Sequence, residues 1–200
     1  MKKGCFGVGI IGLLALVAII AFWGIGIYNK IIPLDNAVKG QWGNVETAYQ
    51  KRADLTDQLV NTVKGARDFE QETLTQVIEA RSKVSQMNID AGDLTEENIA
   101  RIQQAQSGLS GALSRLMVVV ERYPDLKANQ NFLALQSSLE NMADEIRFEQ
   151  RKFNDTAKDY NDYVRKIPNN MIANIGGFKE KGFFKAEEGA NQAPSVDFSN

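Results

Sequence analysis

The chain has 200 residues, of which 44% are hydrophobic and 24% charged, the composition of one folded domain with an attachment. Its formal net charge of -2 disfavours nucleic-acid binding, which needs positive charge to displace counterions. It contains no histidine and one cysteine, Cys5. This excludes His-based catalytic triads, His-ligated metal sites, intrachain disulfides and thiolate clusters. We therefore expect no enzymatic activity, no cofactor and no metal site.

An uncharged apolar segment predicts that residues 1–32 form a transmembrane anchor. Residues 4–29 would make a helix of about 39 Å, enough to cross a hydrocarbon core of about 30 Å. Trp23 and Tyr28 stand at its end, where aromatic rings favour the headgroup level. The alternative is a cleaved signal peptide, but the bulky residues around Trp23 do not form a small-residue cleavage site. We expect the helix to remain uncleaved.

The flanking charges predict the orientation of this single-pass anchor. Lys2 and Lys3 favour a cytoplasmic N-terminus, whereas Lys30 and Lys39 on the other side weaken the signal. We expect a location in the cytoplasmic (inner) membrane, with the soluble part on the outer, periplasmic or extracytoplasmic side. Acylation of Cys5 on the cytoplasmic side is left open. Small residues recur in the segment and favour close approach of helices, at Gly9, Gly12, Ala15, Ala18, Ala21 and Gly24.

Apolar residues at three- and four-residue spacing predict that residues 33–175 form an antiparallel bundle of three long helices. The first helix should cover residues 35–87, the second 95–123 and the third 131–167. A turn at residues 88–93 and a proline at position 124 separate them. Because strand-like alternation is absent, the fold class is all-α.

The first predicted helix is longer than its partners, at about 80 Å against about 43 and 55 Å. Its membrane-proximal part carries an apolar stripe without an obvious partner, formed by Val38, Trp42, Val45 and Tyr49. Exposed stripes of this kind usually mark interfaces, so we expect a homo-oligomer, with a ring-like assembly favoured. Two alternatives stay open. The helix can bend or break at Gly40, Gly43 or Gly65, or the chain's own C-terminal segment can cover the stripe.

Residues 176–200 should form an irregular segment, first aromatic and basic and then polar. Phe178, Phe183 and Phe184 alternate with lysines there, so this stretch either docks on the bundle or rests on the membrane surface. Docking on the bundle is favoured, because three phenylalanines are few for a free membrane contact. Arg52 and Glu149 fall on predicted apolar stripes, where they either pair with each other or reach water at the rim.

Several sequence blocks resemble the LemA family of bacterial membrane proteins, in order and over nearly everything after the anchor. They include YQKRADLTDQLVNTVKGARDFE, LSRLMVVVERYPDLKANQNFLALQSSLE, RKFNDTAKDYNDYVRKIP and GFKEKGFFKAEEGANQAPSVDF. The resemblance implies bacterial origin, a single N-terminal transmembrane helix, an all-α antiparallel bundle and no established enzymatic activity. It carries over no functional residues, and one branch of the family is associated with magnetosome membranes. Gln58 stands where the family often has proline, which implies a straighter first helix.

Three classes of function follow from these features. The favoured one is a non-enzymatic, membrane-anchored helical scaffold that self-assembles at the bacterial envelope and organises or remodels membrane. Its partners would be membrane lipid and further copies of the chain, and not nucleic acid. The second is an adaptor or regulatory partner of a membrane protease or another envelope protein. The third, an enzyme using Asp and Glu chemistry, is disfavoured because no catalytic constellation is visible.

Overall fold

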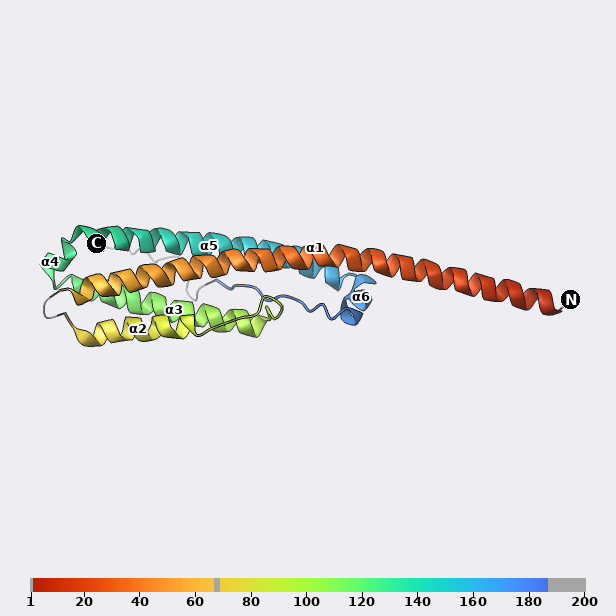
Figure 1. The fold of residues 1–200 in the computed structure, drawn as a ribbon, viewed down its shortest axis with the longest axis horizontal. Coiled ribbons are helices and arrows are strands. Elements are labelled where there is room, and N and C mark those ends of the chain that lie inside the picture. The colour runs from red at the N-terminus through yellow and green to blue at the C-terminus, as the bar shows by residue number, and fades with distance from the viewer. Residues whose placement is uncertain (1, 67–68, 187–200) are drawn as a thin grey trace, which may run out of the picture.

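The computed structural model describes residues 2–66 and 69–186, with side chains from residue 11 onward. Within these residues the chain is helical and has no strand, which confirms the predicted all-α fold. The helices are α1 (Lys2–Lys64), α2 (Gln71–Ser85), α3 (Glu96–Val120), α4 (Pro124–Lys127), α5 (Gln130–Arg165) and α6 (Asn169–Ile175). In Figure 1 the first part of α1 projects from a bundle that its second part forms with the other helices. The polar C-terminal part, residues 187–200, and the side chain of Cys5 lie outside this description.

Helix α1 continues without a break from the predicted anchor into the bundle, over 63 residues. It is also long and apolar enough to cross a membrane in its N-terminal part. The expected domain boundary at residue 33 therefore falls inside a helix. Ile27 and Ile31, which precede that boundary, are buried in the core of the bundle. Anchor and bundle thus share one helix and part of one core.

The helix expected over residues 35–87 is in fact two helices. Helix α1 ends at Lys64, just before Gly65, and α2 begins at Gln71. A glycine costs about 1 kcal/mol in a helix interior, and Phe69 fixes the connection by packing on Tyr123 with ring centroids 4.8 Å apart. The break at Gly65, left open above, is therefore the one that occurs. The described bundle therefore has four long helices, and α5 runs back toward the N-terminal part of α1. Helix α1 passes through Gln58 without a break, as the absence of proline there implied.

Polar side chains cap the starts of α3 and α5. The Thr95 hydroxyl accepts a hydrogen bond from the Asn98 amide at 3.3 Å, and Asn129 Oδ1 accepts from the amides of Asn131 and Phe132. Between these helices, Pro124 occupies the first turn of α4, where its missing N–H has no cost.

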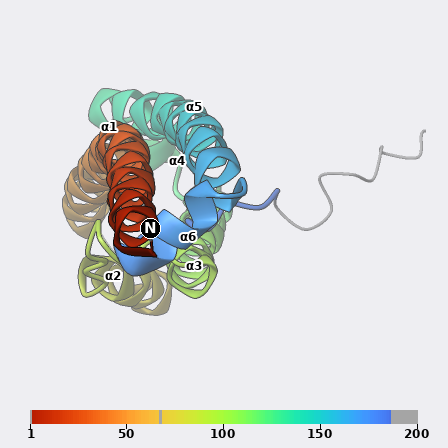
Figure 2. The same cartoon turned by 90° about the vertical axis from the view of Figure 1, so that its right-hand side faces the viewer.

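The core of the bundle consists of two clusters that differ in what covers them. In the distal cluster α1, α2, α3 and α5 surround one another, and α1 packs mainly on α5 and α2 on α3 (Figure 2). Helix α2 has only 15 residues, about 23 Å, so it covers the distal half alone. In the membrane-proximal cluster α1 and α5 pack against the start of α3 and residues that follow α6.

The membrane-proximal stripe is covered by its own chain, which corrects the expectation that it lacks a partner. Its four residues are all buried: Val38, Trp42, Val45 and Tyr49. Trp42 is 1% exposed, and burial raises the pKa of Tyr49 to about 12, although the hydrogen bond from Gln150 opposes the shift. Of the alternatives left open for the stripe, cover by the chain's own C-terminal segment is the one that occurs, since Phe184 stacks on Trp42. These residues are core residues of one chain and offer no free surface for a second copy.

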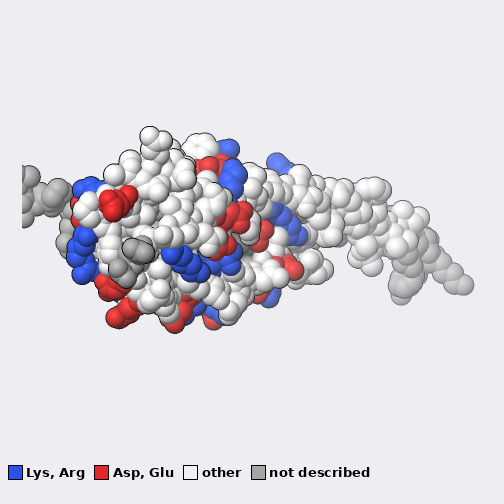
Figure 3. All heavy atoms as spheres, turned by 60° about the vertical axis from the view of Figure 1, so that its left-hand side comes forward, with Lys and Arg blue, Asp and Glu red and all other residues white. Residues whose placement is uncertain are grey.

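In the described part of the chain, charged side chains lie on the bundle, and residues 11–29 of the protruding helix carry none. Figure 3 shows Lys, Arg, Asp and Glu scattered over the bundle, while the described part of the protruding helix is white on this face. The exposed apolar residues of that helix include Ile11, Leu14, Val17 and Phe22. This distribution is the one expected of a helix that leaves water for lipid.

Candidate functional site

An extended segment after α6, residues 178–185, runs back along the membrane-proximal half of the bundle (Figure 1). We call it the C-terminal strap. It lies beside α1, α5 and the start of α3, and Gly182 donates its amide to the Leu94 carbonyl at 2.8 Å. An extended segment has no internal backbone hydrogen bonds, so its polar groups need partners from elsewhere. The strap finds most of these partners in side-chain amides.

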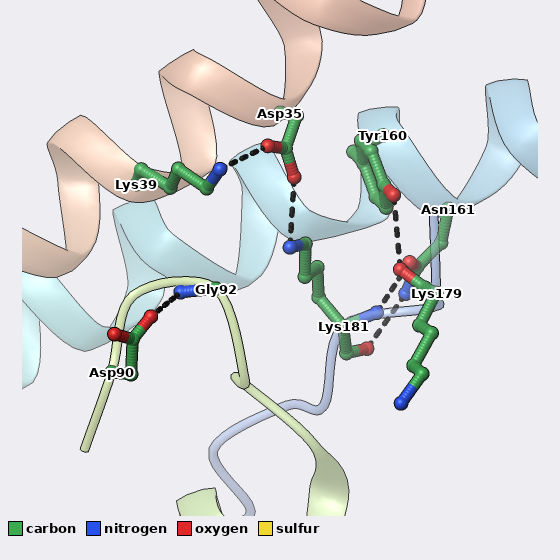
Figure 4. Close-up of polar contacts among 8 residues, drawn as sticks. All are labelled: Asp35, Lys39, Asp90, Gly92, Tyr160, Asn161, Lys179 and Lys181. Atoms are coloured by element: carbon green, nitrogen blue, oxygen red, sulfur yellow. Dashed lines mark hydrogen bonds and ion pairs between the residues drawn. The ribbon is translucent and has the colours of Figure 1, made fainter. Parts of the chain in front are cut away.

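Asn161 of α5 holds both backbone groups of Lys181. Its Nδ2 donates to the Lys181 carbonyl at 2.8 Å, and its Oδ1 accepts the Lys181 amide at 2.9 Å. Two residues earlier in the strap, the Lys179 carbonyl accepts a hydrogen bond from the Tyr160 hydroxyl at 2.9 Å. Figure 4 shows both side chains reaching from α5 to the strap. Asn161 is buried, so water cannot reach its side chain. The two hydrogen bonds to Lys181 satisfy its polar atoms instead.

Two further side-chain amides repeat this arrangement. Asn154 of α5 donates to the Phe184 carbonyl at 2.8 Å and accepts the Phe184 amide at 2.9 Å. Gln103 of α3 donates to the Lys185 carbonyl at 2.6 Å and accepts the Lys185 amide at 3.1 Å. A carboxamide presents a donor and an acceptor side by side, so it pairs with an extended backbone as a neighbouring strand would. The strap is therefore fixed in register at three points.

Gly182 allows the strap to lie directly on the start of α3. A Cβ atom at this position would stand 2.5 Å from Glu96 Cα and 2.6 Å from Glu96 N, both backbone atoms that cannot swing aside. Any larger residue would therefore push the strap off the helix.

The aromatic residues of the strap complete the membrane-proximal core. Phe184 stacks on Trp42 with ring centroids 6.3 Å apart, and both rings contact Phe153 of α5 edge-on. Phe178 meets Tyr28 of α1 at 5.5 Å, and Phe183 is partly buried against the same cluster. Of the two alternatives for the three phenylalanines, the docking on the bundle is the one that the structure shows.

A buried ion pair joins the strap to the helix that leaves the membrane. Lys181 Nζ lies 2.8 Å from Asp35 Oδ1, and Lys39 Nζ lies 2.7 Å from Asp35 Oδ2. In Figure 4 the Asp35 carboxylate stands between the two lysines. Asp35 and Lys181 are both buried, and the Lys181 ammonium also lies 5.2 Å from the centre of the Tyr160 ring. A buried lysine with a carboxylate and an aromatic face is a satisfied cation, because both contacts compensate for lost water.

The two lysines keep Asp35 ionised. Burial alone would raise the pKa of its carboxyl, but the hydrogen bonds and positive charges of Lys181 and Lys39 outweigh burial and hold this pKa below its ordinary value of 3.8. For the neighbouring Tyr160, burial and the charges of Asp35 and Glu180 raise the hydroxyl pKa, so it stays a neutral donor to the strap. At neutral pH Asp35 is therefore ionised and Tyr160 is neutral.

Arg52 and Glu149 have different partners in the structure. Arg52 of α1 is buried and donates to Gln106 at 3.1 Å and Ser110 at 2.7 Å, both on α3. Glu149 of α5 accepts a hydrogen bond from Gln41 at 2.5 Å. Arg52 therefore serves to join α1 to α3 in the interior, which neither of the two interpretations foresaw.

The described side chains include no cluster that could ligate a metal ion. In residues 11–66 and 69–186, no three His, Cys, Asp or Glu side chains lie close enough to hold a metal ion. An open groove of about 740 Å³ lies between α2 and α3. Small residues form its floor and charged ones its rim, among them Ala80, Ala105, Gly108, Lys83, Arg101 and Arg115. Such a groove suits a protein surface better than a small substrate.

Sequence reasoning missed the residues that hold the strap. Asp35, Asn154, Asn161 and Lys181 did not stand out, because none interrupts a predicted apolar stripe. The KDYN block nevertheless contains Tyr160 and Asn161, and Gly182 lies within the KGFF stretch. Each of these residues interacts with a segment distant in sequence, so spacing alone carries no sign of the contact.

Comparison with known proteins agrees with this architecture. The family model described as "LemA family" matches residues 41–198, which include α2 to α6 and the strap. "Protein LemA" of Metamycoplasma hominis is 24% identical over 86% of this chain and 75% of its own length. "Magnetosome protein MamQ 2" of Paramagnetospirillum magneticum is 26% identical over 94% of this chain and 74% of its own length.

A third relative extends the second group to another organism. "Magnetosome protein MamQ" of Magnetospirillum gryphiswaldense is 25% identical over 84% of this chain and 68% of its own length. The family match covers α1 from residue 41 and all later helices, and the alignments with these relatives cover most of the chain. With an apolar N-terminal helix, a helical bundle and a matching family model, this chain belongs to the LemA family.

Proposed function

We propose that this protein is a non-enzymatic, membrane-anchored scaffold that holds its bundle at a fixed height and orientation on the outer side of the bacterial cytoplasmic membrane. The observation that carries the proposal is the continuity of α1 from the apolar span to Lys64. A membrane-anchored enzyme can sit on a flexible linker, whereas a scaffold transmits position only if its attachment is stiff. The strap adds to this stiffness because the ion pair of Asp35 ties the C-terminal end to α1.

Self-assembly, in this proposal, runs through the spanning helix. The membrane-proximal stripe is buried, so it offers no surface for an oligomer or for a ring of copies. The span itself offers small residues at equal height in one membrane, which favours helix contacts in two dimensions. Gly12 has open space around it within its own chain, so a neighbouring helix could approach there. The relatives named as magnetosome proteins fit a role in arranging membrane, and this role is extended to the present chain as part of the proposal.

The mass of the full-length protein in detergent tests the scaffold. We expect an oligomer for the parent, measured by light scattering with the detergent mass subtracted. Gly12→Leu should reduce its size, because the new side chain meets nothing in its own chain and acts only on a neighbour. Leu13→Ile keeps the side-chain volume and serves as the matched control. A monomeric parent, or an oligomer that Gly12→Leu leaves unchanged, would contradict assembly through the span.

The groove between α2 and α3 favours the second candidate, an adaptor for another envelope protein. Its floor of small residues admits a helix backbone, and Lys83, Arg101 and Arg115 on its rim suit an acidic face. Gly108 has open space above it, so Gly108→Phe should fill the groove without disturbing the bundle. The adaptor is supported if the parent is a monomer and a purified envelope protein binds it but not the Gly108→Phe variant. Binding that survives this variant would contradict use of the groove.

A further inference from the structure

The short helix α6 exposes large apolar side chains at the membrane end of the bundle. Ile167, Met171 and Ile175 follow one another at four-residue spacing and are 84%, 62% and 84% exposed. The two isoleucines are more exposed than Phe22, at 77% the most exposed large apolar residue in the described span. Met171 and Ile175 lie four residues apart on one face of α6, and Ile167 directly precedes this helix, before Pro168. We call these three exposed side chains the α6 face. Exposing this apolar face to water would be energetically unfavourable, so it is expected to have a function.

The position of α6 along α1 shows which solvent surrounds the α6 face. Ile172 of α6 packs on Gly24 of α1, where its Cδ1 atom lies 3.3 Å from the place of a Cβ atom. Ala173 is buried in the same cluster as Ile27 and Ile31, and in Figure 2 α6 crosses beside the protruding part of α1. Helix α6 therefore lies beside residues 24–31 of α1 and not beside the distal bundle.

The level of Gly24 is the edge of the hydrocarbon core. The uncharged stretch between Lys3 and Lys30 is longer than the roughly 20 residues that cross a bilayer, and Gly24 lies near its C-terminal end. Tyr28, one turn later, stands at the depth that aromatic rings favour. A segment packed against these two residues meets acyl chains on one side and headgroups on the other.

The charges near α6 agree with this placement. Lys30, Lys166 and Lys179 are exposed on the segments that meet there, and Lys30 lies over the Tyr163 ring at 5.2 Å. Lysines at this depth extend their ammonium groups to the phosphates of lipid headgroups. The nearby Glu180 is paired with Arg165, so it leaves these lysines available to lipid.

We propose that α6 is an interfacial membrane element, whose face of Ile167, Met171 and Ile175 inserts into the lipid of the membrane that α1 spans. The occupant of this apolar face is lipid, because the face continues the surface of the spanning helix at the same depth. Together α1 and α6 give the bundle two points of contact with one membrane, which fixes its tilt. For Phe178, Phe183 and Phe184 a membrane role was the less favoured alternative, and those residues pack on the core. The inference depends on α1 spanning the membrane and not on self-assembly.

Spin labels on the full-length protein in liposomes test this proposal. Each label is placed on a new cysteine in a Cys5→Ser background, because Cys5 is the single native cysteine. Met171→Cys and Ile175→Cys report on α6, and Phe22→Cys is the reference for lipid. Val118→Cys on α3 is the matched reference for water, since Val118 is apolar and 72% exposed but lies in the distal bundle. All four sites are exposed, so the labels should leave the helical content unchanged, which circular dichroism checks.

The accessibility of each label to oxygen and to a water-soluble nickel chelate gives the answer. We expect labels at 171 and 175 to be reached by oxygen and shielded from nickel, as at position 22. Access to nickel equal to that at 118 would overturn the proposal, because the face would then lie in water. Shielding from both reagents would also overturn it, since a protein surface and not lipid would cover the face. The oligomer mass of the Gly12→Leu variant is a separate measurement, so failure of the scaffold and failure of this proposal are distinguishable.

Discussion

The carboxylate of Asp35 lies 2.8 Å from the ammonium of Lys181, and this pair joins the helix that leaves the membrane to the last described segment of the chain. The pair makes stability depend on pH. In the folded protein the pKa of Asp35 lies below 3.8, so the unfolded chain takes up this proton at a higher pH than the folded chain. The contribution of this pair to the free energy of unfolding is therefore complete above the pKa that Asp35 has in the unfolded chain. It is lost as the pH falls through the lower pKa of the folded protein.

Asp35→Asn isolates this contribution from those of other carboxylates. We expect the variant to be less stable at pH 7 by about 3 kcal/mol, the usual cost of breaking one partner of a buried pair. The difference between parent and variant should shrink as the pH falls below 3.8, because the parent then loses the same charge. Urea unfolding at several pH values measures both quantities. A difference that stays constant down to acid pH would contradict an ionised Asp35.

Gly182→Ala should displace the strap. The new methyl group would meet backbone atoms of Glu96 at 2.5 and 2.6 Å, and overpacking of this kind costs about 1–3 kcal/mol. Gly40→Ala is the matched control, because Gly40 lies in α1 with open space around it and alanine favours helix by about 0.5–1 kcal/mol. Thermal unfolding should thus move in opposite directions for the two variants. Equal effects would mean that the strap does not lie on α3.

The side-chain amides that hold the strap should contribute more to its attachment the more deeply they are buried. Asn161→Asp keeps the acceptor for the Lys181 amide but removes the donor to its carbonyl, in a buried place where an unpaired group costs about 1–3 kcal/mol. Gln103→Glu makes the same change at an exposed contact, so water replaces the lost bond at little cost. Limited trypsin digestion should release the strap faster in the first variant. Equal digestion rates would contradict the buried clamp.

Trp42→Ala should damage folding instead of assembly. The ring contacts Phe153 and Phe184 in the core, so truncation leaves a large cavity and should cost about 3–5 kcal/mol. Trp42→Phe keeps an aromatic ring and should cost less. Chemical unfolding measures stability and light scattering measures mass. A smaller oligomer mass with unchanged stability would contradict this result and would mean that the stripe is a contact between copies.

Local chemistry predicted much of this fold. The uncharged span, the three-four spacing and the caps at Thr95 and Asn129 are all visible in sequence, because each depends on neighbours within a few residues. Leu139 of α5, which falls on this three-four spacing, is buried in the distal cluster.

The break at Gly65 was harder to predict and had larger consequences. Propensity alone does not stop a helix at one glycine, and here the packing of Phe69 on Tyr123 stabilises the break. One additional break reverses the direction of every later helix. It places the end of α5, and with it α6, beside the protruding part of α1.

The strap could not be predicted because its partners are distant in sequence. Glycines, lysines and phenylalanines in residues 176–185 have no periodicity, and the stretch gains order only from α5, α3 and α1. For the same reason spacing could not decide whether the stripe of Trp42 is covered by this segment or by a second copy. A segment without secondary structure can thus decide whether an apolar face is an interface or a core.

Hydrogen exchange in the strap of the full-length protein tests this account most directly. The amides of Lys181, Gly182, Phe184 and Lys185 donate to Asn161, Leu94, Asn154 and Gln103 of the same chain. We expect these amides to be protected in lipid nanodiscs that hold a single copy, as strongly as the adjacent part of α5. Exchange at the rate of an unfolded peptide, or protection that appears only when several copies share a disc, would show that the chain does not cover its own membrane-proximal core.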